Sequence, residues 1–240
     1  MKSTYKNIDE FAEGQLLLVN KPYNWTSFDV VGKIRNSFKP LKLKVGHAGT
    51  LDPLATGLLI ICTGKMTKQI DTFQAQEKEY TGTITLGATT PTYDLESEPQ
   101  DAKPYDGLSD ADIKAATAQF TGNIMQRPPA HSAIKRDGKR SYDLAREGIE
   151  VKLDARPVTI TEFEITEIKL PEVHFRVNCS TGTYIRSLAH DFGQALGCGA
   201  YLQELRRTKI GPFDVADALT PQEWQKIWKT PDFMKGESAK

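Results

Sequence analysis

Residues 46–59 are Gly-His-Ala-Gly-Thr-Leu-Asp-Pro-Leu-Ala-Thr-Gly-Leu-Leu. The three glycines and one proline of this stretch predict an irregular loop, because glycine allows backbone conformations that other residues avoid and proline removes a hydrogen-bond donor. One carboxylate, Asp52, stands at the centre of the loop among apolar neighbours. The apolar run that follows predicts a buried strand over 58–63. The stretch therefore predicts a loop that presents a single ionisable group just before a buried strand.

The flanking segments predict further elements on both sides of this loop. Residues 15–20 form a short apolar run that ends at Lys21-Pro22, which predicts a buried strand. Thr26 or Ser27 can cap a helix. The predicted apolar face of that helix consists of Phe28, Val31, Ile34 and Phe38. Strict alternation over 78–86 predicts a strand with Tyr80 on its inner face.

The C-terminal half contains mostly strands. Residues 157–170 and 173–180 predict two antiparallel strands, a helix follows from Ile185, and 200–209 predict another strand. Ser109 and Thr220 each begin a helix-capping pattern, whereas 90–108 are acidic and rich in turn formers, which predicts a loop. Because strands outnumber helices and mostly follow one another directly, we expect an α+β fold with a mixed, mostly antiparallel central sheet and flanking helices and loops.

Composition narrows the class of protein. The longest apolar run, 58–62, is too short to cross a bilayer, and the N-terminus lacks the apolar segment of a signal peptide, so we expect a cytoplasmic protein that does not bind a membrane. The cysteines at 62, 179 and 198 are widely spaced, which favours buried, reduced thiols. The four histidines lack metal-ligand spacing, and we expect no metal.

The formal net charge is zero, but the charges are not evenly mixed. Residues 33–44 contain five bases and no acid, 127–146 contain six bases and two acids, and Arg206, Arg207 and Lys209 form a third group. Such local basic faces suit a phosphate backbone, although each one alone is more often a solvated surface. A nucleotide-binding P-loop is excluded. The nearest match is the string at 63–67, but the motif requires a glycine where Leu59 stands and a Ser or Thr where Met66 stands.

The stretch 46–59 resembles the catalytic motif of the bacterial tRNA pseudouridine-55 synthases, the TruB family. Other segments resemble motifs of the same family, in the same order along the chain. These are 16–22 (the lead strand and its Lys-Pro turn), 78–80 (the strand with the active-site tyrosine), 126–133 and 138–142 (the substrate-facing loop), 179–186 (the arginine motif) and 205–207 (the final core strand). The resemblance covers about 15–210 and implies the pseudouridine synthase fold.

The resemblance implies a catalytic role for Asp52, Tyr80 and Arg186. Asp52 matches the carboxylate that acts beside the ribose, whereas an aspartate in a loop otherwise often caps the following turn. Arg186 matches the arginine that pairs with this aspartate, and an adjacent cation favours an ionised carboxylate where water is excluded. The alternative for Arg186 is a surface or phosphate-binding arginine. Tyr80 matches the tyrosine that stacks on the flipped-out base; the alternative is a core tyrosine with a hydrogen-bonded hydroxyl.

The resemblance also implies substrate-binding residues. His47 matches the residue that meets the displaced nucleotides of the T loop. Tyr184 and Leu205 match substrate-contact positions, although the sequence alone indicates that both are core residues. Lys21 matches the Lys-Pro turn and is expected to support the catalytic loop, with a solvated lysine as the alternative.

The expected domains are a polar leader at 1–14, a catalytic domain at 15–210 and a short C-terminal remnant at 211–240 that is too short for the PUA-type RNA-binding module of many relatives. The expected partner is the T arm of tRNA, and we expect a monomer without an obligatory protein partner. Because the isomerisation neither adds nor removes atoms, no cofactor is expected. Two alternatives remain open: a non-catalytic tRNA-binding or folding factor, and the catalytic subunit of a guide-RNA particle.

Overall fold

The computed structural model describes residues 8–39, 42–132, 135–136, 139–140 and 153–229. The chain forms two compact units, one from 1–80 with 206–240 (unit 1) and the other from 81–205 (unit 2). The division falls inside strands β4 (Lys78–Leu86) and β10 (Ala200–Ile210), so each of these strands contributes residues to both units. Each unit is described separately below.

Unit 1 is built around strand β3 (Ala55–Thr63). Strand β1 (Leu16–Lys21) pairs antiparallel with β3, from Leu16 opposite Cys62 to Lys21 opposite Gly57. The short strand β2 (Val45–His47) also pairs antiparallel with β3, and β11 (Phe213–Asp214) pairs with the end of β10. The predicted strands at 15–20 and 58–63 are confirmed, and β3 begins three residues earlier than expected.

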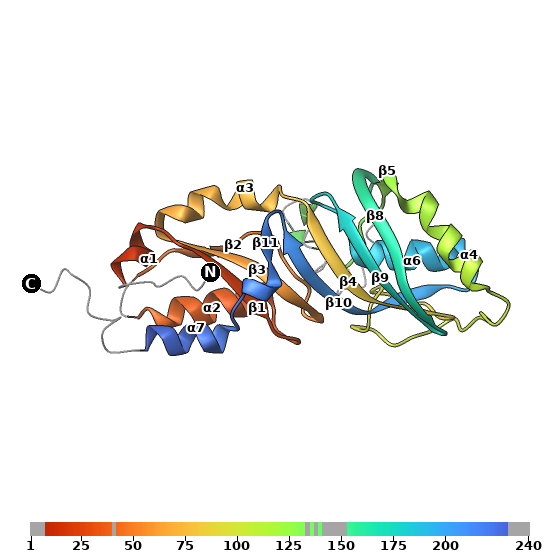
Figure 1. Cartoon of the computed structure of the whole chain (residues 1–240), viewed down its shortest axis with the longest axis horizontal. Helices are drawn as coiled ribbons and strands as arrows, with labels where there is room; N and C mark the ends of the chain where they lie inside the picture. The colour runs from red at the N-terminus through yellow and green to blue at the C-terminus, as the bar shows by residue number, and fades with distance from the viewer. Residues whose placement is uncertain (1–7, 40–41, 133–134, 137–138, 141–152, 230–240) are drawn as a thin grey trace, which may run out of the picture. The chain divides into compact units, whose positions relative to one another are not determined.

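The side chains of β3 are buried on both faces of the sheet. Leu59 and Ile61 pack into one apolar cluster with residues of helices α1 (Asp9–Glu13), α2 (Ser27–Ser37) and α7 (Pro221–Trp228), whereas Leu58, Ile60 and Cys62 pack into a second cluster. A strand that is covered on both faces requires a continuous apolar run, which explains why 58–62 lacks the usual alternation. Helices α2 and α7 lie side by side in this unit (Figure 1).

The predicted helix starts are confirmed by capping boxes, in which a side chain and a backbone N–H exchange hydrogen bonds at Thr26, Ser109 and Thr220. The predicted apolar face of α2 is wrong at one position. Val31, Ile34 and Phe38 are buried as expected, but Phe28 is 66% exposed. Ser27 occupies the inward-facing position of this turn instead, one turn before Val30 and Val31.

Unit 2 contains a sheet with the strand order β4-β9-β8-β5. Strands β8 (Arg156–Lys169) and β9 (Glu172–Cys179) form the predicted antiparallel pair, and β5 (Gly122–Gln126) pairs antiparallel with β8. Helix α6 (Ile185–Ala195) packs against β8 through Phe192 and Phe163, whose ring centroids are 5.3 Å apart. Helix α4 (Asp110–Ala115) follows the predicted 90–108 loop. The predicted α+β fold with a mostly antiparallel sheet and flanking helices is confirmed.

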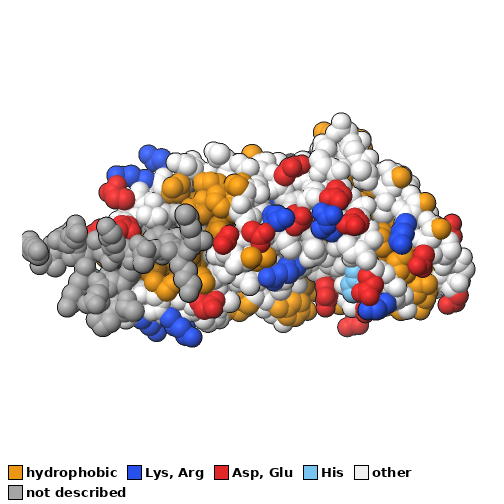
Figure 2. Space-filling model, in the orientation of Figure 1, with side chains coloured by type: hydrophobic (Ala, Val, Ile, Leu, Met, Phe, Trp, Pro, Cys, Tyr) orange, Lys and Arg blue, Asp and Glu red, His pale blue; other side chains and the backbone are white. Residues whose placement is uncertain are grey.

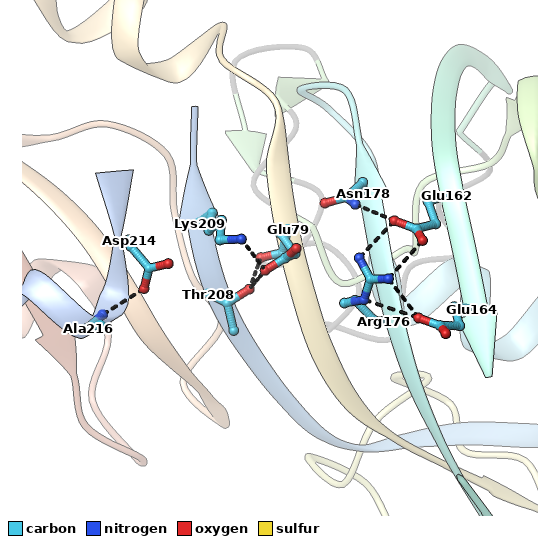
Figure 3. Close-up of polar contacts among 9 residues, drawn as sticks. All are labelled: Glu79, Glu162, Glu164, Arg176, Asn178, Thr208, Lys209, Asp214 and Ala216. Atoms are coloured by element: carbon cyan, nitrogen blue, oxygen red, sulfur yellow. Dashed lines mark hydrogen bonds and ion pairs between the residues drawn. The ribbon is translucent and has the colours of Figure 1, made fainter. Parts of the chain in front are cut away.

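The solvent face of the β8–β9 pair contains charges of both signs. Arg176 donates to Glu162 and Glu164 at 2.7–3.2 Å, and Asn178 donates to Glu162 at 2.7 Å (Figure 3). Figure 2 shows acidic and basic side chains interspersed on the visible surface of the molecule. A face with mixed charges provides no continuous positive surface for a phosphate backbone.

All three cysteines, at positions 62, 179 and 198, are buried and form no disulfide. Among the described residues, no helix is both long and apolar enough to span a membrane.

Candidate active site

Asp52 lies in the loop that joins β2 to β3 in unit 1 and is half-buried. The loop is closed by two backbone hydrogen bonds, from Ala48 N to the Ile60 carbonyl (2.9 Å) and from Ala55 N to the Asp52 carbonyl (3.1 Å). Gly57 has a φ of 103°. A Cβ atom at Gly57 would lie 2.2 Å from the Arg207 carbonyl oxygen, so only glycine allows β3 to approach β10 here.

Lys21 is fully buried beneath this loop. Its Nζ donates to the carbonyl oxygens of Pro22 and Trp25 and, at 3.2 Å, to that of Pro53, the residue after Asp52. Burial lowers the pKa of Lys21 to about 8; the charge of Asp52 opposes this shift and that of Arg207 adds to it. Lys21 therefore supports the Asp52 loop as expected, and the alternative of a solvated lysine is wrong.

Two further side chains fix the loop from other elements of unit 1. The Oγ of Ser27, at the start of α2, accepts from Leu51 N at 2.9 Å and donates to the Leu51 carbonyl at 3.3 Å. Arg207, on β10, donates from Nε to the Leu58 carbonyl at 2.7 Å and from Nη2 to the Gly49 carbonyl at 3.2 Å. Together with Lys21, these side chains bind the loop on both sides of Asp52.

Only part of the third basic group of the sequence lies at the surface. Arg207 is 1% exposed and is used inside unit 1. Arg206 is half-buried and lies 3.4 Å from Asn20 Oδ1 and from Thr56 Oγ1. Lys209 lies 3.5 Å from Glu79, which also accepts a 2.7 Å hydrogen bond from Thr208 (Figure 3). Arg207 is therefore an internal residue of unit 1, whereas Lys209 is exposed.

His47 ends β2, at the entrance to the loop, and is half-buried. Burial and, secondarily, the charge of Arg207 lower its pKa, whereas a hydrogen bond with the Gly49 backbone acts in the opposite sense. Burial therefore favours the neutral form of the His47 ring. Tyr80, on β4, is 8% exposed, which confirms the predicted inward orientation.

Arg186 lies in the first turn of α6 in unit 2 and is 5% exposed. Its Nη1 lies 3.6 Å from an oxygen of Asp94 and donates to the Thr92 carbonyl at 3.3 Å, and its Nη2 donates to the His131 carbonyl at 2.9 Å. Asp94 is itself 4% exposed. The buried ion pair and the carbonyl contacts fix the guanidinium, which excludes the alternative of a surface arginine.

Gln126 fixes the start of the same helix. Its side chain accepts from Tyr184 N at 2.8 Å and donates to the Tyr184 carbonyl at 3.0 Å. Tyr184 is the N-cap of α6, and Ser187 in the first turn donates to the Arg127 carbonyl at 2.8 Å. The segment 126–129 therefore positions the backbone that carries Arg186. Leu205, on β10, is half-buried.

The structure thus places Lys21, His47, Asp52 and Tyr80 in unit 1, and Tyr184, Arg186 and Leu205 in unit 2. The pairing of Asp52 with Arg186 stays a prediction, because the two residues belong to different units. Sequence reasoning missed Ser27, Asp94 and Arg207 as supporting residues; Asp94 lies in a segment that was predicted only as a loop.

Most of the expected substrate-facing segment 138–142 lies outside the described residues. Within the described part of the chain, no group of three His, Cys, Asp or Glu side chains could hold a metal ion.

Two family models together match most of the chain. The N-terminal domain of the TruB family pseudouridylate synthases matches residues 35–185, and the C-terminal domain of tRNA pseudouridylate synthase B matches residues 186–234. A tRNA pseudouridine synthase B of Flavobacterium johnsoniae is 54% identical over 216 residues, which cover 88% of this chain and 94% of the relative. That of Bacteroides fragilis strain ATCC 25285 is 51% identical over 218 residues, with coverage of 89% and 94%.

Two solved structures are also similar. A chain in a crystal structure of a Cbf5-Nop10-Gar1 complex is 31% identical, with a TM-score of 0.70 and coverage of 91% of this chain. A chain in the structure of an H/ACA RNP bound to a substrate RNA containing 2′-deoxyuridine is 27% identical, with a TM-score of 0.69 and coverage of 94%. This chain spans only 56% and 59% of the length of those two chains.

Proposed function

The chain belongs to the TruB family of pseudouridylate synthases, and from this premise we propose that it isomerises uridine 55 in the T loop of tRNA to pseudouridine, with Asp52 as the catalytic carboxylate. The names of the curated relatives support tRNA as the substrate. The strongest structural support is the anchoring of the Asp52 loop. Lys21, Ser27 and Arg207 bind the backbone on both sides of the carboxylate, as a precisely placed reactive group requires.

The reaction breaks the N1–C1′ bond, turns the uracil and forms a C5–C1′ bond. One proton leaves C5 and one is gained at N1, so the overall composition is unchanged and no redox partner is consumed. A carboxylate beside the ribose can begin this in two ways, by attacking C1′ as a nucleophile or by removing the 2′ proton to give a glycal. Both routes pass through a sugar with positive character, which an anion stabilises.

Two networks support the proposed roles of Arg186 and Tyr80. Asp94 and the carbonyl groups of Thr92 and His131 hold the Arg186 guanidinium in a fixed orientation, which suits an arginine that pairs with a catalytic carboxylate. The Glu79 contacts with Thr208 and Lys209 fix the strand immediately before Tyr80. In the proposal Tyr80 stacks on the flipped base, and His47, Tyr184 and Leu205 contact the RNA.

The target base must leave its stack before it can react, which costs a few kcal/mol. Contacts to the RNA backbone and replacement stacking must supply this energy. The exposed basic side chains of Arg35, Lys39, Lys42 and Lys44 are candidates for the contacts to the RNA backbone. The proposal includes a monomeric cytoplasmic enzyme that uses neither a guide RNA nor a protein partner.

The test uses an unmodified tRNA transcript with tritium at C5 of uridine. The purified wild-type protein is expected to release tritium without any added guide RNA. The Asp52→Asn variant keeps the size of the side chain and removes the charge, so we expect turnover to fall below detection while tRNA affinity is retained. A transcript with cytidine at position 55 is the substrate control.

Each alternative predicts a different result. Binding of tRNA by the wild-type protein without tritium release would identify a non-catalytic binding factor. Release that requires a guide RNA would identify a guide-dependent subunit. Near-normal turnover by Asp52→Asn would refute the role of Asp52.

A further inference from the structure

Phe28 is exposed although its sequence context predicts burial. It is 66% exposed, whereas the adjacent Ser27 is 2% exposed and Val31 is 5% exposed. The reason is a contact between residues distant in the sequence: Ser27 faces inward because its hydroxyl binds the backbone of Leu51, and this orientation of α2 turns Phe28 outward. An exposed aromatic ring keeps its apolar surface in contact with water.

The ring of Phe28 lies beside the predicted catalytic loop. Its centroid is 6.3 Å from that of His47, with the two rings nearly perpendicular at 80°. Ser27 precedes Phe28 and is bonded to Leu51, which precedes Asp52. The Phe28–His47 pair is therefore held at a fixed position relative to the Asp52 loop, within unit 1.

The surroundings of the pair favour a nucleotide as the ligand. Burial favours the neutral form of His47, whose ring has a polar edge. The chain segment that follows Phe28 carries four exposed basic side chains, Arg35, Lys39, Lys42 and Lys44. The one acid in the first turn of α2, Asp29, is occupied by hydrogen bonds with Thr26. An exposed aromatic ring on a segment that also carries exposed cations matches an unpaired base with its phosphate, because bases stack on aromatic rings and phosphates bind Lys and Arg.

We infer that the exposed ring of Phe28, held in place beside His47, is a stacking platform for an unpaired nucleobase of the RNA substrate, next to the base that is isomerised. The inference rests on the proposed function and adds a specific substrate-binding residue, Phe28, to it. Stacking on this platform replaces part of the base stacking that is lost when the target uridine is flipped out.

The test is a series of substitutions at Phe28. Because the side chain is exposed, Phe28→Ala is expected to leave the melting temperature unchanged and to weaken tRNA binding about 10-fold, the usual size of a lost base–aromatic stack. Phe28→Trp should restore binding, whereas Phe28→Leu, which is apolar but not aromatic, should not. Leu170→Ala, another exposed apolar side chain, is the control and should bind as the wild type does.

Salt dependence separates stacking from charge. The slope of log Kd against log salt concentration should be the same for Phe28→Ala and the wild type, whereas Arg35→Ala should reduce it by about one if Arg35 binds a phosphate. A tRNA with 2-aminopurine at one unpaired T-loop position at a time locates the stacked base. Quenching at one position should be lost in Phe28→Ala and regained in Phe28→Trp.

Wild-type affinity in Phe28→Ala, or rescue by Leu as complete as that by Trp, would overturn the inference. Failure of the proposed function is a separate result, because the wild-type protein would then release no tritium from uridine. The 2-aminopurine signal does not depend on turnover and would still report the platform.

Discussion

Arg207 Nη2 donates a 3.2 Å hydrogen bond to the carbonyl oxygen of Gly49, 158 residues earlier in the chain. The same guanidinium donates from Nε to the Leu58 carbonyl, so one buried side chain binds the loop before and after Asp52. Arginine suits this role because its donors are fixed in one plane. The position of the predicted catalytic carboxylate therefore depends on a residue of the last long strand.

Arg207→Lys tests this dependence. Lysine keeps the charge but has a single point of donation, which cannot reproduce both contacts. Small displacements of a reacting group can lower a rate by about 100-fold, so we expect kcat to fall by about 10- to 100-fold with little change in KM for tRNA. Arg206→Lys is the matched control, since the contacts of Arg206 are long. An unchanged kcat in Arg207→Lys would contradict the anchoring role.

The lowered pKa of Lys21 predicts a pH dependence of stability. The pKa is about 8 in the folded protein, against 10.5 for an unperturbed lysine, so the folded protein loses this proton first as the pH rises. Burial of the charged form is costly below pH 8, and this cost is relieved between pH 8 and 10.5. The free energy of unfolding of the wild type should therefore rise relative to Lys21→Met by about 2 kcal/mol from pH 7 to pH 9.5. Urea denaturation at both pH values measures this; a constant or decreasing difference would contradict it.

The buried Arg186–Asp94 pair and the exposed Arg176 network should respond differently to substitution. Asp94→Asn keeps the shape but removes a buried ionic partner of Arg186, and we expect a loss of up to about 3 kcal/mol in stability together with a reduced kcat. Arg176→Ala, at the surface, should cost less than about 1 kcal/mol and leave kcat unchanged. Thermal unfolding and tritium release measure both effects. Equal losses in the two variants would mean that burial does not distinguish these pairs.

Two glycine substitutions should have opposite effects. Gly57→Ala places a Cβ atom 2.2 Å from the Arg207 carbonyl oxygen at a φ of 103°, so we expect severe destabilisation, by more than about 2 kcal/mol. Gly32→Ala in α2 meets no atom within 4 Å, and we expect a gain of about 0.5–1 kcal/mol from helix propensity. Melting temperatures compare the two variants. Tolerance of alanine at Gly57 would refute the close approach of β3 and β10.

Local patterns predicted most of the elements because their causes are local. Alternation of apolar residues located β4 and β9, and the capping residues Thr26, Ser109 and Thr220 marked helix starts, since each forms its bonds within three residues. Phe28 shows the limit of such patterns: a first-turn residue can lie on either edge of the apolar face. The hydrogen bond from Leu51 to Ser27, 24 residues apart, decided which edge is buried.

Only part of the candidate site could be predicted, because some of its contacts join residues that are distant in the sequence. The motif at 46–57 and the family resemblance identified Asp52, Lys21 and Arg186 without any coordinates. Asp94 could not be recognised, because a lone acid in an acidic loop gives no sign of burial. Its partner, Arg186, is 92 positions away in the chain.

The sequence by itself determined the order of the strands and helices and the glycine positions, because these follow from propensity and from interactions between near neighbours, and its motifs named the candidate reactive groups. Only the tertiary structure decided which cations are internal. Arg206 and Arg207 are adjacent and chemically identical, yet Arg207 is buried against Gly49 and Leu58 while Arg206 is only half-buried. That difference arises because successive residues of a strand point to opposite faces, and only packing of the whole unit determines which face is covered.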